Sequence, residues 1–443
     1  MALGGGTFIT QNKVLPGSYI NFISAATASA GLSERGIAAL PMPLDYAPTG
    51  VFEVTGEDMQ KNTRKLFACD YTDIKLRPLR DAFRHCTRAY VYNINGGSTA
   101  KNATNTYATA KYPGAGGNNF SIKIESIAGD DTNYRVSTLL AGVVLDEQIV
   151  PKTGGAAQLV DNDYVTFAKE ATLAETAGTA LAGGVTGTTP TYQDALDALE
   201  AYPFNTLCCT ATDDTTKALF ANYTKRLRDE MGKKFQVVIH KCPAANADFE
   251  GVINLDNIVA GTQTSDADYG ALVYWLTGAE AGCEVNRSCT NMLYDGEYSV
   301  DTNYTQQQLI DNINAGKLTL HRVDNSVRVL TDINSLVTYT SDKGKIFASN
   351  QTIRVIDQIA NDIASLFNSK YLGVYPNDVM GRVELKADIT SHHEQLQNIG
   401  AIENFDSGDV TVERGDEKTS VVVTGNVEVV GTMEKLYMTV VVA

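Results

Sequence analysis

The histidines are the side chains from which acid–base or metal chemistry would have to be built. The chain has five of them, namely His85, His240, His321, His392 and His393. A serine hydrolase needs a nucleophile held beside such a base. The sequence contains neither a Gly-x-Ser-x-Gly elbow nor a Gly-Thr-Ser-x-Ala segment that would present one. His240 ends an apolar run, which favours a structural role.

The adjacent pair His392 and His393, followed by Glu394, is the clearest metal candidate. Neighbouring residues of a helix point about 100° apart, unlike the i, i+4 pair that places two ligands on one face. The seven cysteines are odd in number and lack Cys-x-x-Cys spacing, so we expect reduced, mostly buried thiols. The sequence therefore predicts no metal site.

The glycine clusters do not form a phosphate-binding loop. Gly4–Gly6, Gly96–Gly97 and Gly114–Gly117 lack the Lys and Ser/Thr that follow such a loop, and none joins a strand directly to a helix. The many carboxylates show no pattern that singles out an acid and base pair. We predict no cofactor and no enzymatic activity.

Charge and composition narrow the function classes further. The 443 residues carry 36 Lys and Arg against 52 Asp and Glu, a formal charge of −16, which opposes general binding to nucleic acid or to anionic membranes. The 43% hydrophobic content suffices for ordinary cores. No apolar run approaches the roughly 20 residues of a membrane helix, and the N-terminus is neutral, so we expect synthesis in the cytoplasm without membrane insertion.

The middle of the chain predicts an α/β domain. A helix over 191–202 is followed by a short buried strand, by a helix that begins at Asp213/Asp214 and stops at Gly232, and by a strand over 235–242. This order predicts a parallel sheet flanked by helices, with a further buried helix over 267–282.

Before this domain, the composition shifts after Asn95 to Gly, Ala, Thr and Asn. Alternating runs such as Phe120–Ile127, separated by Gly and Asn turns, predict a small all-β unit inserted over 96–190. The preceding run over 89–95 is typical of a buried strand.

The last part of the chain mixes helices and strands. A hairpin is expected over 318–336 with its turn at Asp324-Asn325, and a main helix over 351–370 with Ile356, Ile359 and Ile363 on its apolar face. The opposite, polar face includes Arg354. A second helix near 383–399 and two valine-rich strands, over 420–430 and 433–443, complete the chain.

The sequences at both ends of the chain are typical of strands, and neither has an obvious neighbouring strand with which to pair. The run 433–443 (MEKLYMTVVVA) contains no Gly, Pro or Asp, and an apolar strand with free N–H and C=O groups must pair within its own domain or with a neighbouring chain. The N-terminal arm, residues 1–24, holds a second extended stretch tethered through glycines. The tail is either a core strand or a linker between subunits.

The order and spacing of several blocks resemble contractile tail sheath proteins, particularly those of phages and phage-like particles from Gram-positive bacteria. The blocks cover nearly the whole chain and include PGSYINF, AKYPGAGGNNF, RLRDEMGKKFQVVIH, KGKIFASNQTIRVIDQIANDIASLFNSKYLG, LQNIGAIENF and MEKLYMTVVV. The resemblance implies a structural subunit that stacks helically around an inner tail tube and contracts to drive the tube through a cell envelope.

The resemblance also implies a fold and partners. The fold would be α/β and α+β multidomain, with a subtilisin-like α/β middle domain lacking the protease residues, an inserted outer β domain, and an α+β C-terminal domain with exchanged terminal strands. The expected partners are further copies of the chain, the tube protein, and baseplate and tail terminator proteins, in a virion tail or phage-like particle. The expected divisions are 1–24, 25–95, 96–190, 191–335 and 336–443.

Two sets of contact residues follow from this resemblance. Terminal strands would link subunits through Gly17, Tyr19, Ile20 and Phe22 of the arm and Leu436, Tyr437, Met438, Val440 and Val441 of the tail. Cations of the inward-facing C-terminal domain could pair with an acidic tube, and the candidates are Arg354, Lys370, Lys343 and Lys345. An ordinary solvated helix face is the alternative for the second set. The alternatives for the whole chain are a hydrolase on the α/β domain or another structural component of the same kind of particle.

Overall fold

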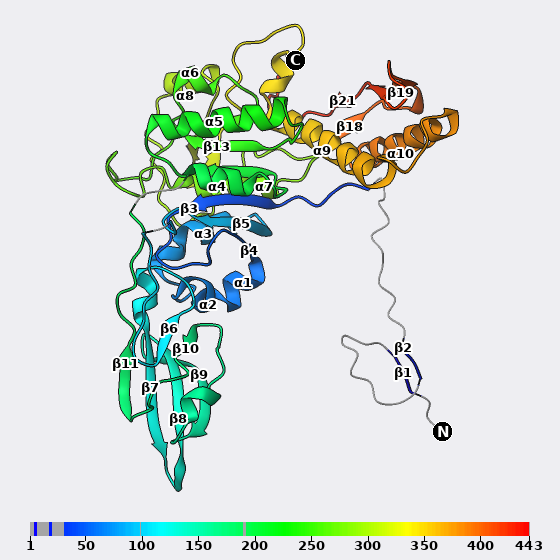
Figure 1. The fold of residues 1–443 in the computed structure, drawn as a ribbon. Helices are drawn as coiled ribbons and strands as arrows, with labels where there is room; N and C mark the ends of the chain where they lie inside the picture. The colour runs from blue at the N-terminus through cyan, green and yellow to red at the C-terminus, as the bar shows by residue number, and fades with distance from the viewer. Residues whose placement is uncertain (1–3, 7–16, 20–30, 98, 189–191, 443) are drawn as a thin grey trace. The chain divides into compact units, whose positions relative to one another are not determined.

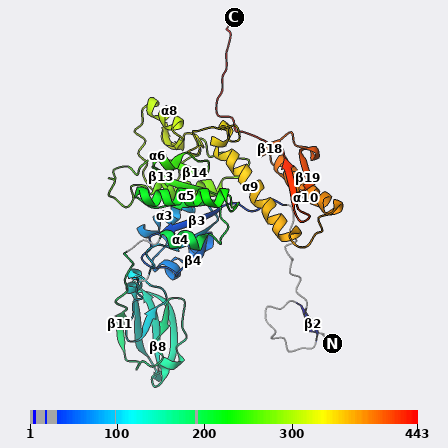
Figure 2. The ribbon, with the colours of Figure 1, turned by 45° about the horizontal axis from the view of Figure 1, so that its top comes forward.

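The computed structural model describes residues 4–6, 17–19, 31–97, 99–188 and 192–442. They divide into two compact units. The larger unit comprises the described residues of 34–358 and 429–442, and the smaller unit comprises the described residues of 4–33 and 359–428. Figures 1 and 2 show the elements of both.

A seven-stranded sheet forms the centre of the larger unit (Figure 1). Its strands are parallel except β4, which pairs antiparallel with β5 at one edge. The apolar runs with little alternation are typical of strands covered on both faces. In sheet order the strands are β15 (Lys317–Leu318), β14 (Val252–Leu255), β13 (Gln236–His240), β12 (Thr206–Cys209), β3 (Ile37–Met42), β5 (Arg88–Asn93) and β4 (Val51–Thr55).

Helices cover both faces of this sheet, as the alternation of β3 shows. Ala38 and Leu40 pack with helices α3 (Arg77–Ala82) and α7 (Leu272–Gly282). Ile37 and Ala39 point the other way and pack with α4 (Tyr192–Leu199) and α5 (Asp214–Asp229). The predicted parallel sheet with flanking helices is therefore present, and the α5 start is capped by Asp213, which accepts from the Thr216 N–H.

Shorter elements connect and flank this core. Helix α1 begins with a capping box between Thr55 and Asp58. The predicted hairpin is formed by β16 (Leu320–Val323) and β17 (Ser326–Val329), with Asp324 at φ 51° in its turn. The remaining short helices are α1 (Gly56–Lys61), α2 (Thr63–Phe67), α6 (Ala244–Ala247), α8 (Gln306–Asn314), η1 (Ile74–Leu76) and η4 (Lys345–Ala348).

The described residues between 96 and 188 form β strands and two short 3₁₀ helices. Phe120, Ile122 and Ile124 are buried while the intervening residues are not, which is the period-two pattern of a sheet with one covered face. The strands are β11 (Thr176–Ala180), β7 (Phe120–Ile127), β8 (Asp130–Leu140) and β9 (Val143–Pro151) in one sheet, and β6 (Ala108–Ala110) with β10 (Val165–Phe167) in another; the helices are η2 (Ala115–Asn119) and η3 (Gly155–Gln158).

The two ends of this β segment lie next to each other. The Gly187 N–H donates to the Asn95 carbonyl at 2.8 Å, so the two ends of the segment are adjacent. Tyr46, which follows β3, packs into the core of the segment beside Phe120. Gly114 is required next to it, because a Cβ there would lie 2.0 Å from the Asp45 carbonyl oxygen.

The smaller unit holds the second half of helix α9, which begins in the larger unit, and most of the elements that follow it. Helix α9 (Asn350–Leu366) ends in a π turn (Phe367–Tyr371), and α10 (Val379–Asn398) begins at the Asp378 cap. β19 (Val410–Arg414) and β20 (Val421–Gly425) form an antiparallel pair. The other elements are β18 (Ile402–Glu403), η6 (Ser407–Asp409), β21 (Glu428–Val429), and the parallel pair β1 (Gly4–Gly6) and β2 (Gly17–Tyr19).

Candidate functional site

The C-terminal tail is anchored at its base and exposed beyond it. The Gln351 side chain donates to the Val430 carbonyl at 3.0 Å and accepts from the Thr432 N–H at 3.2 Å, and Thr290 donates to Glu434 at 2.8 Å. Beyond this anchor, no residue up to Val442 is assigned to a helix or strand. Figure 2 shows the segment as an extended thread that projects away from the main sheet and its helices.

The predicted linker residues of the tail are therefore solvent-exposed in a single subunit. Their exposed fractions are 85% for Leu436, 90% for Tyr437, 73% for Met438, 68% for Val440 and 86% for Val441. The alternative of a core strand within its own subunit is wrong, because a core strand would be buried. Contiguous exposed apolar side chains of this kind mark an interaction site.

At the other end of the chain, Gly17 and Tyr19 lie in β2, which pairs with β1 of the same arm. Ile20 and Phe22 lie outside the described residues. The role of the arm as a linker stays a prediction.

The smaller unit has a strand edge that could accept another strand. β19 and β20 form a sheet of two strands within the described part of the chain, so β20 has one ladder partner. Val422 and Val423 on β20 are 51% and 42% exposed. An exposed apolar strand with one edge open is a template for pairing with an added strand.

The predicted tube contacts need correction, because Arg354 is buried. It is 2% exposed, and its guanidinium bonds Glu280 at 2.6 Å, Asp332 at 3.3 Å and the Arg287 carbonyl at 2.7 Å. The helical periodicity placed Arg354 on a polar and therefore outer face, but the face is covered by acidic side chains from α7 and from the loop after β17. Gln358 and Asp362, four and eight residues further along the same face of the helix, are also buried.

The three predicted lysine contacts lie at or near the surface. Lys343 pairs with Glu250 at 2.5 Å and Lys370 pairs with Asp388 at 2.7 Å, so both cations already have acidic partners. Lys345 is exposed. Of the four candidates, Lys345 fits a partner-facing cation best, and contact with a tube stays a prediction.

The two buried carboxyl groups that contact Arg354 have pKa values shifted in opposite directions. Burial and the neighbouring Asp332 raise the pKa of Glu280 well above its usual range, against the pull of Arg354. Burial acts the same way on Asp332, but Arg354 and hydrogen bonds from the Cys289 N–H and Asn350 outweigh it and lower the pKa of Asp332. Glu280, Cys289 and Asp332 come close enough to share a cation, and the Arg354 guanidinium is that cation.

The contacts of His392 and Ser33 differ from those of a hydrolytic site. His392 bonds Asp362 at 2.9 Å, and the Ser33 hydroxyl donates to the same Asp362 rather than to the imidazole. A nucleophile needs its base as the direct partner. The arrangement instead fixes Ser33 to α9.

Acid should weaken the fold through His393. Burial, with the charge of His392, lowers the pKa of His393 to about 4, below the ordinary value of 6.5. Between pH 6.5 and 4, His393 is protonated in the unfolded chain but not in the folded chain. The free energy of unfolding therefore decreases as the pH drops from 6.5 to 4, by up to about 3 kcal/mol. Urea unfolding at pH 7 and pH 5 should show this loss in the native chain and a smaller loss in His393→Gln. An equal loss in both would contradict it.

Comparisons with known proteins bear on the whole chain. Residues 95–191 match the phage tail sheath protein beta-sandwich domain, 183–335 its central domain and 342–443 its C-terminal domain. The chain is 32% identical to the phage-like element PBSX protein XkdK of Bacillus subtilis, over 99% of each protein. The chain belongs to the phage tail sheath family.

Solved structures agree with this assignment. The sheath tail protein of Desulfitobacterium hafniense is 35% identical, with a TM-score of 0.77 over 95% of this chain and 99% of that one. The sheath tail protein Lin1278 of Listeria innocua is 28% identical with a TM-score of 0.77, over 92% and 94% of the two chains. The contracted sheath of the anti-feeding prophage, at 14% identity and a TM-score of 0.55, shares the fold.

The protein is thus a tail sheath structural subunit, a component of a phage or phage-like particle. Its fold is the mixed α/β multidomain sheath fold with a beta-sandwich domain. No helix in the described parts of the chain has the length and apolar character needed to cross a bilayer.

Proposed function

We propose that the subunit polymerises helically around an inner tail tube and contracts to drive that tube through a target envelope. The observation that carries this proposal is the tail, a run of exposed apolar residues that is anchored at Thr432 and Glu434 and has no place in its own subunit. A neighbouring copy is the natural partner, because head-to-tail contacts that do not close into a ring generate an open helix.

The β20 edge of a neighbouring subunit is the proposed acceptor for this tail. Residues 434–442 would add as a strand to β20, so that backbone hydrogen bonds give affinity and the alternating side chains pack on Val422 and Val423. Such a ladder resists separation while the connecting chain permits rotation. A sleeve that contracts needs both properties, because its side-chain interfaces must break and re-form while the subunits stay connected.

Contraction is proposed to be release from a kinetically trapped extended state, without a nucleotide. The larger unit would be a subtilisin-like α/β body without the protease residues. The tube protein, a baseplate and a tail terminator are the proposed partners besides further copies of the chain. The N-terminal arm would reach a second neighbour in the same way as the tail.

Electron microscopy of the purified full chain tests the proposal. Hollow, regularly striated cylinders are the expected result, formed by the chain alone or on added tube protein. Compact single particles under both conditions would contradict it, and hydrolysis that depends on His240 or His321 would favour the hydrolase alternative.

The β segment over 96–186 is proposed to lie outermost and to be dispensable for assembly. Because Asn95 and Gly187 are hydrogen-bonded neighbours, a short Gly-Ser link should close the gap after deletion. Tyr46 should be changed to Ser in the same variant, since deletion exposes its ring. We expect cylinders of smaller outer diameter by electron microscopy, with Tyr46→Ser alone as the control. Folded but unassembled subunits would show that the segment makes required contacts.

A further inference from the structure

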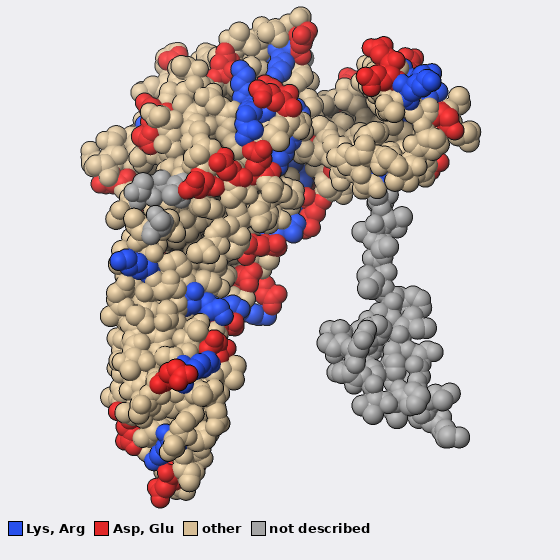
Figure 3. Space-filling model, viewed as in Figure 1, with Lys and Arg blue, Asp and Glu red and all other residues tan. Residues whose placement is uncertain are grey.

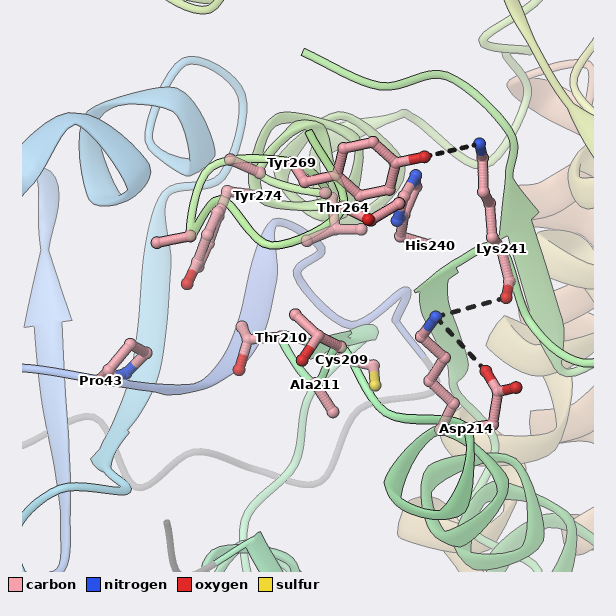
Figure 4. Close-up of a pocket in the computed structure, with 16 residues that line it drawn as sticks. Pro43, Cys209, Thr210, Ala211, Asp214, His240, Lys241, Thr264, Tyr269 and Tyr274 are labelled. Carbon is pink, nitrogen blue, oxygen red and sulfur yellow. Dashed lines mark hydrogen bonds and ion pairs between the residues drawn. The ribbon is translucent and has the colours of Figure 1, made fainter. Parts of the chain in front are cut away.

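A pocket of about 300 Å³ opens beside the main sheet at the point where its strand order reverses. β3 lies between β12 on one side and β5 on the other. The chain runs from β3 to the β5 side first and then crosses back to β12, so the strand order changes direction at β3. Crevices at the carboxyl ends of strands at such a switch point are where open α/β sheets bind ligands. Pro43 after β3, Thr210 after β12 and Lys241 after β13 line this pocket (Figure 4).

Two buried polar side chains that line the pocket have unused or weak hydrogen-bonding groups. Lys217, on the first turn of α5, is 6% exposed, and its ammonium lies 3.8 Å from an Asp214 oxygen and 3.5 Å from the Lys241 carbonyl. An ammonium has three donors, and both contacts are too long for strong charge-assisted bonds. His240 is also 6% exposed, and its Nε2 has no hydrogen-bond partner.

The charges around the pocket favour an anion. Lys217 and Lys241 supply two cations against Asp214, whose side chain is 79% exposed and therefore well solvated. The N-terminus of the sixteen-residue α5 lies on the same side, where the exposed Asp213 carboxylate already caps the Thr216 N–H, so the two lysines supply the charge that favours an anion. Figure 4 shows the Lys241 ammonium engaged with the Tyr269 hydroxyl, at 3.2 Å, so Lys217 is the cation with the weaker existing contacts.

We propose that this pocket binds a small oxyanion, a phosphate or carboxylate group, with Lys217 as its principal cation and His240 as a second polar contact. The ligand accepts hydrogen bonds from the buried Lys217 ammonium and stabilises the carboxyl ends of the central strands β3, β12 and β13. Its size is that of a free ion or small metabolite, because the cavity lies at the lower end of the range of small-molecule sites.

Calorimetric titration of the full-length subunit with inorganic phosphate, and separately with acetate, tests the proposal. Saturable binding of either probe is expected, and the tighter one identifies the oxyanion class. Lys217→Met keeps the length and apolar stem of the side chain and should weaken binding about tenfold or more, since it removes a charge-assisted contact. Lys225→Met, at an exposed position on the same helix, should bind as the native chain does.

A second variant tests the proposal independently in case the Lys217→Met chain does not fold. His240→Phe keeps a ring in the buried space and should also weaken binding, while circular dichroism reports the retained fold. Absence of binding by both probes, or unchanged affinity in a folded Lys217→Met chain, would overturn the proposal.

Discussion

Removal of residues 433–443 should abolish assembly while leaving the subunit folded. The deleted residues contribute almost nothing to the core, because the side chains from Leu436 to Val442 are largely exposed. The loss of the solvent-exposed hydrogen bond from Thr290 to Glu434 should cost at most about 1 kcal/mol. Electron microscopy should show cylinders for the full chain and none for the truncated one, with closely similar circular dichroism and unfolding curves.

Single substitutions separate backbone pairing from simple loss of apolar surface. Tyr437→Pro and Met438→Pro, each made singly, remove adjacent N–H groups from the middle of the tail. Successive N–H groups of an added strand point to opposite sides, so one of the two prolines removes a hydrogen bond to β20. Met438→Ala removes apolar surface but keeps its N–H. We expect few or no cylinders from at least one proline variant and near-native assembly from the alanine variant. Equal assembly of all three variants would mean that side-chain packing, not a shared ladder, joins the subunits.

Replacement of Arg354 by Met should be the most destabilising single change in the larger unit. It leaves Glu280 and Asp332 buried beside each other without their cation. Breaking a buried ion pair by removal of one partner costs about 3 to 5 kcal/mol, because the remaining charge is uncompensated. Chemical unfolding monitored by circular dichroism measures this loss.

The acid dependence of the Arg354→Met variant identifies the cause. In the native chain the pKa of Asp332 is lowered, so its ionised form stabilises the fold at pH values above the ordinary pKa of an aspartate. This contribution is lost as the pH falls through the pKa that Asp332 has in the folded chain. In the variant both carboxyl groups gain from protonation, so the gap to the native chain should narrow as the pH falls toward 4. Arg287→Met is the matched control, because that side chain is 72% exposed and should change stability by less than about 0.5 kcal/mol. A gap that is constant with pH would contradict the electrostatic explanation.

The regular elements could be predicted where the sequence pattern and the local environment agree. The alternation of Phe120–Ile127 predicts β7 to the residue, because one face of that strand is buried and the other is not. The Asp213 cap and the positive φ at Gly232 delimit α5 in the same local way. The hairpin turn is local as well, because Asp324 adopts the positive φ that the turn requires.

Arg354 and the tail could not be placed by the same reasoning. The periodicity of α9 separates polar from apolar positions, but it carries no information about Glu280 and Asp332, which reach Arg354 from 74 and 22 residues away. The tail has the composition of a strand, yet strand formation needs a partner that a single subunit does not offer. The pocket beside His240 depends on the order of strands in the sheet, which the sequence alone did not provide.

A high-resolution cryo-electron microscopy map of the full-length polymer would show directly whether a strand from one subunit completes a sheet in the next. We expect continuous density for residues 434–442 of each subunit along the β20 edge of a neighbour, at ladder spacing of about 4.8 Å. A polymer in which this tail lies on its own subunit, or contacts the neighbour through side chains alone, would rule out strand exchange.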